Sequence, residues 1–387
     1  MSFRQSKPLM ESSSTTNPQI PPSNLDAPPL SEIFALVILS YAVFYTALFL
    51  GGGLSLVGGS AFGDNPAYLT PAAAIQHWQF TGVEVHQFWG VSYATAFLST
   101  LTRIPLRPAF VLLCVAASLA ALTLCHRLWG GWVAAFFCLL SLDWFQRSLL
   151  GGAEPLFIAL ILAAFLALRR EKWAWSAVFA ALATVVRPYG LIALIGLGIQ
   201  LLWKRRFREC TFAILVALLI GGLYAWPLAH YFGNPLANVA SYQHNDWHGA
   251  PPFTFPFVSI LRDTLLSPAP LTNRALTSVW VALMLLGAVF AIKSGDLRKY
   301  ARSYPAETCF ACLYWVALFT YSSPEWARAE FPRFALPLLP WVLLFLYSDL
   351  PKQRWVVWSL AVVTPTLAAA SAIGIRNILS TLARYLH

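Results

Sequence analysis

The stretch IFALVILSYAVFYTALFL, residues 33–50, contains apolar, aromatic and small polar residues and no charge. A transmembrane α-helix needs about 20 residues of this kind to cross the hydrocarbon core of a bilayer. Similar runs recur along the rest of the chain. We predict about eleven spans, at Ile33–Leu50, Ala109–Cys125, Trp129–Phe145, Pro155–Leu168, Trp173–Val186, Tyr189–Trp203, Thr211–Ala229, Thr277–Lys293, Ala306–Tyr321, Phe334–Tyr347 and Trp355–Ile375.

The composition agrees with a membrane protein. Hydrophobic residues make up 58% of the 387 residues and charged residues 11%, with a mean hydropathy of +0.63. A soluble domain contains roughly a quarter charged residues. The net charge of +10 does not indicate nucleic acid, because the basic residues stand in short clusters between apolar runs, as in cytoplasmic loops. We therefore predict an all-α polytopic membrane helical bundle without a nucleic-acid partner.

The basic residues orient the predicted spans. Every lysine falls on one side if residues 88–101 form an amphipathic helix on the outer surface instead of crossing the membrane. We take the lysine side as cytoplasmic, in a bacterial plasma membrane. Residues 1–30, rich in Ser, Pro and Asn, are predicted to be a disordered cytoplasmic tail, and residues 31–387 a single transmembrane domain. Its long outer loops are residues 51–108 and 230–276.

The first outer loop offers a catalytic acid. Asp64 follows the first span closely and should lie near the outer membrane surface, where a carboxylate can accept a proton from an attacking hydroxyl. The alternative is that Asp64 only caps the helix that begins at Pro66. Glu84 and His86 in the same loop could position an acceptor or bind a cation; as ordinary loop residues they would simply be solvated.

Two arginines on the outer side are candidates for phosphate binding. Arg187 stands between two apolar runs, and Arg333 directly precedes the span Phe334–Tyr347. Arginine stays charged and can hold a phosphate with two parallel hydrogen bonds. The alternative is an arginine that extends to the membrane interface. Glu330, close to Arg333, could equally belong to an ordinary solvated loop.

Further ionisable residues gather where the span Trp129–Phe145 ends and the next begins. These are Asp143, Arg147 and Glu154. Ionisable groups at membrane depth are costly and tend to be paired or functional. Asp143 and Arg147 could form an intrahelical ion pair, and Glu154 suits the start of a helix because of the helix dipole.

The second outer loop contains His244, Asp246 and His248. On a helix the two histidines could share a metal. Gly249 and the two prolines after it favour a loop, so sugar binding is the better interpretation. The chain has no GxGxxG, P-loop or HExxH motif and no serine triad, so no nucleotide cofactor is predicted, and a divalent metal is left open.

These residues together resemble the GT-C membrane glycosyltransferases, which use polyprenyl-phosphate sugars. The first loop has Asp64, then Tyr68-Leu69, then Ala73, similar to the pattern of an acid followed by Tyr after the first helix of these enzymes. GAEPLF at 152–157 and ALATVVRPYGL at 181–191 resemble their mid-chain consensus. HYFGNP at 230–235 also fits, and EFPRFALPLLP at 330–340 resembles a late loop-to-helix segment.

The resemblance implies a helical bundle with juxtamembrane helices in the first outer loop. It implies a catalytic acid at Asp64, with Tyr68, Glu154 and Glu330 in supporting positions. The activity would be an inverting hexosyl or mannosyl transfer in the cell envelope, from a polyprenyl-phosphate donor to a lipid or glycan acceptor on the outer (periplasmic or lumenal) face.

The nearest groups are the GPI mannosyltransferase II-like and the lipid A aminoarabinose transferase-like enzymes. The chain departs from the paired acids of some members, because Asn65 follows Asp64. Two alternatives remain open at this point. One is a transporter or flippase of lipid-linked glycans, and the other is a non-catalytic membrane protein of envelope assembly.

Overall fold

The computed structural model describes residues 27–80, 82–83, 85–244, 253–266, 270–322 and 330–386. Nearly all of the tail predicted at residues 1–30 lies outside these ranges. Among the described residues the regular structure is helical, and the β pairing consists of an isolated bridge between Phe253 and Tyr321. The predicted all-α class is therefore confirmed for the part of the chain that is described.

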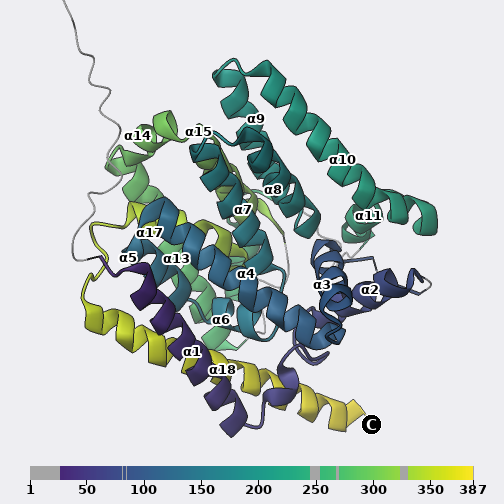
Figure 1. The fold of residues 1–387 in the computed structure, drawn as a ribbon. Coiled ribbons are helices and arrows are strands. Elements are labelled where there is room, and N and C mark those ends of the chain that lie inside the picture. Colours follow the sequence, from purple (N-terminus) through teal and green to yellow (C-terminus); the bar gives the residue numbers. More distant parts are fainter. Residues whose placement is uncertain are drawn as a thin grey trace, which may run out of the picture.

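The first part of the described chain, coloured purple to teal in Figure 1, forms nine α-helices and one 3-10 turn. They are α1 (Leu30–Leu50), the 3-10 turn η1 (Leu54–Leu56), α2 (Asn65–His77), α3 (Gly90–Thr102), α4 (Leu106–Trp129), α5 (Gly131–Leu139), α6 (Leu142–Leu149), α7 (Glu154–Arg169), α8 (Trp173–Val186) and α9 (Gly190–Trp203).

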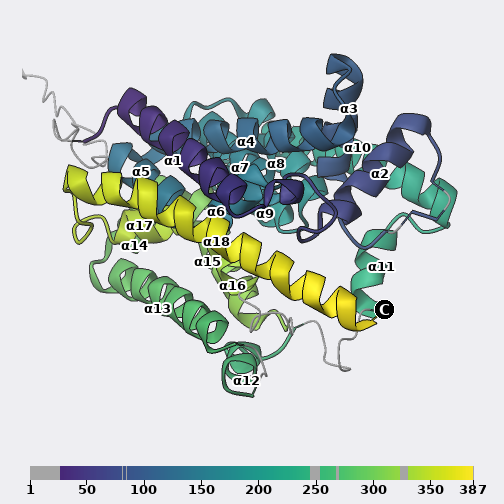
Figure 2. The same cartoon turned by 90° about the horizontal axis from the view of Figure 1, so that it is seen from below.

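The second part adds further long helices and several short ones. They are α10 (Phe207–Phe232), α11 (Ala237–His244), α12 (Val258–Leu266), α13 (Leu271–Lys293), α14 (Asp296–Ser303), α15 (Pro305–Thr320), α16 (Glu330–Ala335), the 3-10 turn η3 (Leu336–Leu338), α17 (Leu339–Phe345) and α18 (Arg354–Leu386). Figure 2 shows α1 and α18 side by side, and Ser40 Oγ joins them by donating to the carbonyl of Ala361 at 2.9 Å.

Five helices of the described chain are long and apolar enough to cross a membrane: α1, α4, α10, α13 and the first part of α18. The pair α6 and α7 makes a sixth span if its two helices, bent by 102° at the break between them, are taken as one. The helices α8 and α9 are apolar but shorter. The predicted polytopic membrane bundle is confirmed, and the number of about eleven spans stays a prediction.

Two predicted spans are broken in the structure. Residues 129–145 do not form one helix, because α5 ends at Leu139 and the Oγ of Ser141 caps α6 by accepting from the backbone N of Trp144 at 3.3 Å. Residues 334–347 are divided among α16, η3 and α17. Pro337 and Pro340 lie in this stretch and lack the backbone N–H that a continuous helix requires.

The first outer loop contains the two helices that were expected there. α2 starts at Asn65, and α3 covers most of the predicted surface segment 88–101. The two helices pack together, and Gln76 Nε2 donates to Ser99 Oγ at 2.9 Å between them. Figure 1 shows α2 and α3 beside each other at the edge of the bundle, away from α14.

The basic loops gather at one end of the bundle. At the end of α7, Arg169 donates to both carboxylate oxygens of Glu307 on α15, at 2.7 and 2.8 Å. Arg169 also donates to the carbonyl of Leu128 near the end of α4. Lys204 lies over the Trp173 ring at the start of α8. The placing of all the basic clusters on one side of the membrane stays a prediction.

Candidate active site

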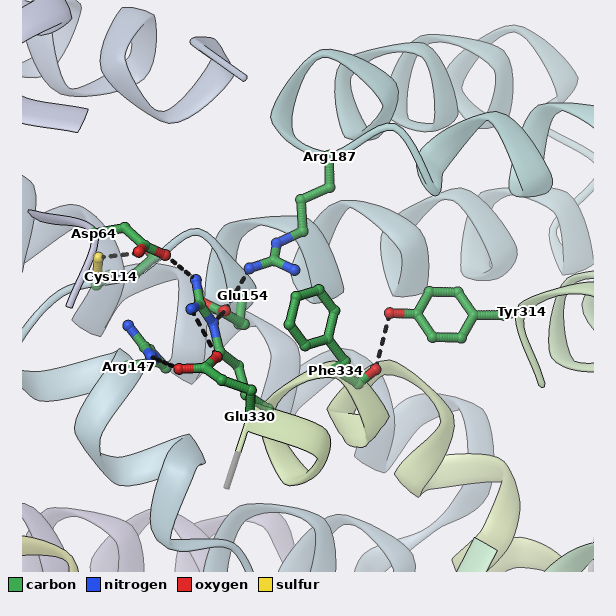
Figure 3. A network of polar contacts seen from close by, with 10 residues as sticks. Asp64, Cys114, Arg147, Glu154, Arg187, Tyr314, Glu330 and Phe334 are labelled. Atoms are coloured by element: carbon green, nitrogen blue, oxygen red, sulfur yellow. Dashed lines mark hydrogen bonds and ion pairs between the residues drawn. The ribbon is translucent and has the colours of Figure 1, made fainter. Parts of the chain in front are cut away.

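The opposite end of α7 carries a cluster of carboxylates and guanidiniums. α7 has 16 residues, from Glu154 to Arg169, and at 1.5 Å per residue its two ends are about 24 Å apart. The cluster consists of Asp64, Arg147, Glu154, Arg187, Glu330 and Arg333 (Figure 3). It therefore lies far from the end at which the basic loops gather.

Asp64 occupies the residue position just before α2, but its side chain makes no capping hydrogen bond to that helix. Its carboxylate instead accepts from Nη2 of Arg333, and 29% of the side chain is exposed. The interpretation of Asp64 as a simple helix cap is wrong in this structure. The carboxylate is directed toward the ion cluster and remains partly accessible.

Asn65 anchors the loop that presents Asp64. Its side chain is fully buried, and Nδ2 donates to the carbonyls of Gly59 at 3.2 Å and Leu150 at 3.0 Å. The backbone N of Gly58 donates to the same Leu150 carbonyl at 2.8 Å. These bonds attach the first outer loop to the break between α6 and α7. The residue that stands where some GT-C members have a second acid therefore has a structural role here.

Glu154 lies at the first residue of α7, directly after the bend, and is 1% exposed. Its Oε1 accepts from Nη2 of Arg187 and from Nε of Arg333. The bend lets the acid point into the bundle instead of into lipid. A buried carboxylate requires such partners, because an unpaired charge in a dry interior is strongly unfavourable.

Arg333 connects the three carboxylates. Besides Glu154 and Asp64 it reaches Glu330, one turn earlier on α16, with Nη1 at 3.1 Å from Oε2. Arg333 is 5% exposed, so it is not an arginine that extends to the membrane interface. The predicted loop charges Glu330 and Arg333 thus belong to one buried network.

Arg187 enters the cluster from the connection between α8 and α9. Its backbone is extended, with φ −148° and ψ 138°, so α8 ends at the preceding residue and the side chain turns inward. The guanidinium carbon lies 5.5 Å from the centre of the Phe334 ring. Since Arg187 is 9% exposed, the alternative of an arginine at the membrane surface is wrong for it as well.

Arg147 is also part of the cluster, although its sequence spacing suggested only an ion pair with Asp143. Among the described residues no ion pair joins Arg147 to Asp143, and the nearest carboxylate oxygen is that of Glu330, 4.0 Å from Nη2. The guanidinium carbon lies 5.2 Å from the centre of the Phe62 ring, in the loop before Asp64. In the sequence, the feature that pointed to Arg147 was its position as a charged residue at the end of an apolar run.

Charge keeps Asp64 ionised. Burial of the carboxylate raises its pKa, but the nearby charges of Arg333 and Arg147 and the hydrogen bond from Arg333 outweigh burial, so the pKa of Asp64 lies below its ordinary value of 3.8. The neighbouring Tyr68 is buried, and burial together with the Asp64 charge raises the pKa of its phenol well above 10. At neutral pH Asp64 is therefore an anion and Tyr68 is a neutral phenol.

Of the other predicted residues, Tyr68 adjoins the cluster, whereas His86 and His244 belong to the segments described next. His86 lies between Val85 and Gln87, whose carbonyls accept from Nδ2 of Asn238 on α11, each at 2.5 Å. His244 is the last residue of α11. Glu84, Asp246 and His248 lie outside the described residues. Within the described ranges no three His, Cys, Asp or Glu side chains are grouped as a metal site would need.

A sequence model of glycosyltransferase family 87 matches residues 92–324, which is more than half of the chain. The chain belongs to glycosyltransferase family 87. Arg147, Glu154 and Arg187 lie inside the matched range, whereas Asp64, Glu330 and Arg333 lie outside it. Neither a curated protein nor a solved structure matches the chain.

Membership in family 87 makes this protein a membrane glycosyltransferase, with a sugar donor and an acceptor as substrates. The family assignment and the ion cluster are independent observations. They overlap, because three of the six cluster residues lie in the matched segment. Of the five Asp, Glu, Lys and Arg residues that are buried in the described structure, four belong to the cluster: Arg147, Glu154, Arg187 and Arg333. We therefore take it as the candidate active site of the family 87 protein.

Proposed function

We propose that this family 87 protein transfers a sugar from a polyprenyl-phosphate donor to a hydroxyl of a lipid or glycan acceptor, with Asp64 as the catalytic base. The observation that carries the proposal is the cluster of three carboxylates with three guanidiniums around a partly exposed Asp64. A base for the acceptor and cations for a leaving phosphate are the groups that such a transfer needs.

The proposed step is a single displacement. The acceptor oxygen forms a bond to the anomeric carbon of the sugar while its proton passes to the Asp64 carboxylate. The bond between the anomeric carbon and the phosphate oxygen breaks, and its electron pair goes to the phosphate. Attack opposite the leaving group inverts the anomeric carbon. Arg187 would stabilise the negative charge that grows on the departing phosphate.

Arg333 was predicted to bind the donor phosphate, and its geometry refines that hypothesis. All three of its nitrogens contact carboxylates: those of Glu154, Glu330 and Asp64. A phosphate could bind Arg333 only by replacing one of these partners. We therefore propose that Arg333 mainly positions Asp64 and keeps it ionised, and that contact with the phosphate would follow displacement of a carboxylate.

The proposed location of the reaction is the outer membrane surface. Positive residues favour the cytoplasmic side of a membrane, and the basic loops gather at the end of α7 that carries Arg169. The Asp64 cluster lies at the other end of α7. On this argument the N-terminus is cytoplasmic and the cluster faces the periplasm or lumen, in a bacterial plasma membrane.

The narrower relationships are part of the proposal. The resemblance to GT-C enzymes favours a hexosyl or mannosyl donor and a product of the cell envelope. A kinship with the GPI mannosyltransferase II-like or the lipid A aminoarabinose transferase-like group stays a prediction. The alternatives of a lipid-linked glycan flippase or a non-catalytic assembly protein receive no support from membership in a glycosyltransferase family.

The test is transfer by the full-length protein in liposomes supplied with radiolabelled polyprenyl-phosphate sugars or, in a parallel arm, nucleotide sugars. We expect transfer from the polyprenyl donor, and a loss of about 10²- to 10⁴-fold in Asp64→Asn, the usual contribution of acid–base catalysis. Asp296→Asn is the matched control, because Asp296 is exposed on α14 at the basic end. Near-normal transfer by Asp64→Asn would show that Asp64 is not the base. Transfer from nucleotide sugars alone would show that the donor is not a polyprenyl-phosphate sugar.

A further inference from the structure

The three arginines of the cluster differ in how many of their hydrogen-bond donors are used. A guanidinium has five N–H donors on three nitrogens and no acceptor. In Arg333 each nitrogen donates to a carboxylate. In Arg187, Nη2 donates to Glu154, whereas the buried Nε has no partner. The arginine at the centre of the network therefore has the least free capacity.

Of the three arginines, Arg147 has the most unused hydrogen-bond donors. Its Nε and Nη1 are both buried without a hydrogen-bond partner, and the residue is 6% exposed. The Nη2 atom lies 4.0 Å from the Glu330 carboxylate, which is too long for a hydrogen bond. Leaving donors of a buried cation unsatisfied is unfavourable, and such a group calls for an explanation. An anionic ligand would supply the missing acceptors.

The free donors of Arg147 lie beside the loop that carries Asp64. A Cβ atom on Gly63, the residue before Asp64, would lie 2.6 Å from Nη1 of Arg147. A Cβ atom on Gly152 would lie 2.8 Å from Cδ of the same arginine. Glycine at both positions therefore lets the guanidinium lie against the backbone of the Asp64 loop and of the bend before α7. Figure 3 shows Arg147 and Asp64 on the same side of the cluster.

Among the three guanidiniums of the cluster, that of Arg147 makes no hydrogen bond to a carboxylate in the described structure. Asp64, Glu154 and Glu330 balance the three guanidiniums, and Glu154 and Glu330 are held by Arg333. Arg147 has the weakest attachment to these carboxylates, since its closest approach is the 4.0 Å contact with Glu330. An incoming anion can accept from Nη1 or from Nε of Arg147 without replacing a hydrogen-bonded carboxylate. The same anion at Arg333 would have to displace a carboxylate.

We propose that Arg147 is the first ligand of the phosphate group of the lipid-linked donor, and of the polyprenyl phosphate that is released as product. This assignment rests on the proposed function, and deepens it by separating two roles. Arg147 together with Nε of Arg187 binds the phosphate oxygens, and Arg333 positions the base. Nε and Nη1 lie on different edges of the guanidinium, so each of them donates to a separate acceptor, and one oxygen of the phosphate accepts from Arg147 while another accepts from Arg187.

The test measures binding and needs no acceptor. Full-length protein in detergent is titrated by calorimetry with farnesyl phosphate, a short isoprenoid phosphate, and with farnesol, the neutral alcohol of the same chain. We expect wild type to prefer the phosphate, and Arg147→Gln to lose about ten- to a hundredfold of affinity for the phosphate, the range expected for hydrogen bonds to a charged group. Affinity for farnesol should stay unchanged.

Two further variants make the result decisive. Arg147→Lys keeps the charge and loses the planar guanidinium donors, so we expect an intermediate loss, and it replaces Arg147→Gln if that variant fails to fold. Arg107→Gln is the matched control, because Arg107 is exposed and its Nε and Nη2 donate to loop carbonyls at 2.7 Å. This control should bind farnesyl phosphate as wild type does.

The outcomes separate this proposal from the proposed function. If wild type prefers farnesyl phosphate and both Arg147 variants keep wild-type affinity for it, the assignment of Arg147 is overturned while a polyprenyl-phosphate donor stands. If wild type binds farnesyl phosphate no better than farnesol, the donor class itself fails. An equal loss of affinity for both ligands in Arg147→Gln would mark a structural role and would also overturn the assignment.

Discussion

Replacing Arg333 by Gln should strongly destabilise the protein. Arg333 is 5% exposed and donates to Asp64, Glu154 and Glu330. Glutamine keeps one amide donor but removes the charge. Glu154, which is 1% exposed, would then be paired with Arg187 alone. Asp64 would lose its nearest cation.

The expected magnitude follows from this geometry. Removal of one partner from a buried ion pair costs about 3–5 kcal/mol, because the remaining charge is left uncompensated. The pKa of Asp64 is lowered in the folded protein, so its pairing stabilises the fold above the ordinary pKa of 3.8 and is lost as the pH falls through the lowered value. The destabilisation should therefore be complete at neutral pH and become smaller in acid.

The measurement is the free energy of unfolding in mixed micelles, obtained by titration with a denaturing detergent at neutral and acidic pH. Arg206→Gln is the control, since Arg206 also pairs with a glutamate, Glu209, but the two side chains are 42% and 34% exposed. An exposed pair contributes little. A loss below about 1 kcal/mol in Arg333→Gln, the range of surface pairs, would refute the reasoning, as would a loss that increases in acid.

Three further results are expected. Glu307→Gln should destabilise the basic end by about 3–5 kcal/mol, since it leaves Arg169 in a buried site without its carboxylate; the transfer rate per folded molecule should not change, and a large change would contradict the separation of the two ends. Asn238→Ala should remove the amide donor that the carbonyls of Val85 and Gln87 share, cost about 1–3 kcal/mol and speed hydrogen exchange of residues 85–89; unchanged exchange would refute this role. Arg187→Lys should slow transfer at least about tenfold, because a point charge cannot replace the guanidinium fork, and an unaltered rate would show that the fork is not used.

Much of the fold follows from local features of the chain. The long apolar runs predict α1, α4, α10 and α13, because a bilayer requires uninterrupted apolar helices and hydropathy is a property of neighbouring residues. The start of α2 after Asp64 was likewise predicted, from Pro66 at the beginning of the helix. The connection between the spans Trp129–Phe145 and Pro155–Leu168 was predicted, and α6 and α7 are indeed separated at residues 150–153. The break at residues 140–141 was not predicted, since the apolar run continues through it and only tertiary packing decides that a helix stops there.

The sequence by itself determined that this chain is a helical membrane protein with charged residues at the ends of its apolar runs. Only the tertiary structure decided that six of these residues form one cluster, and which arginine pairs with which acid. The partners of each ion pair are far apart in the sequence: Glu154 and Arg187 are separated by 33 positions, Glu154 and Arg333 by 179, and Asp64 and Arg333 by 269. No local pattern specifies such pairings, because the cost of burying each charge is met by whichever opposite charge the packed helices bring to it.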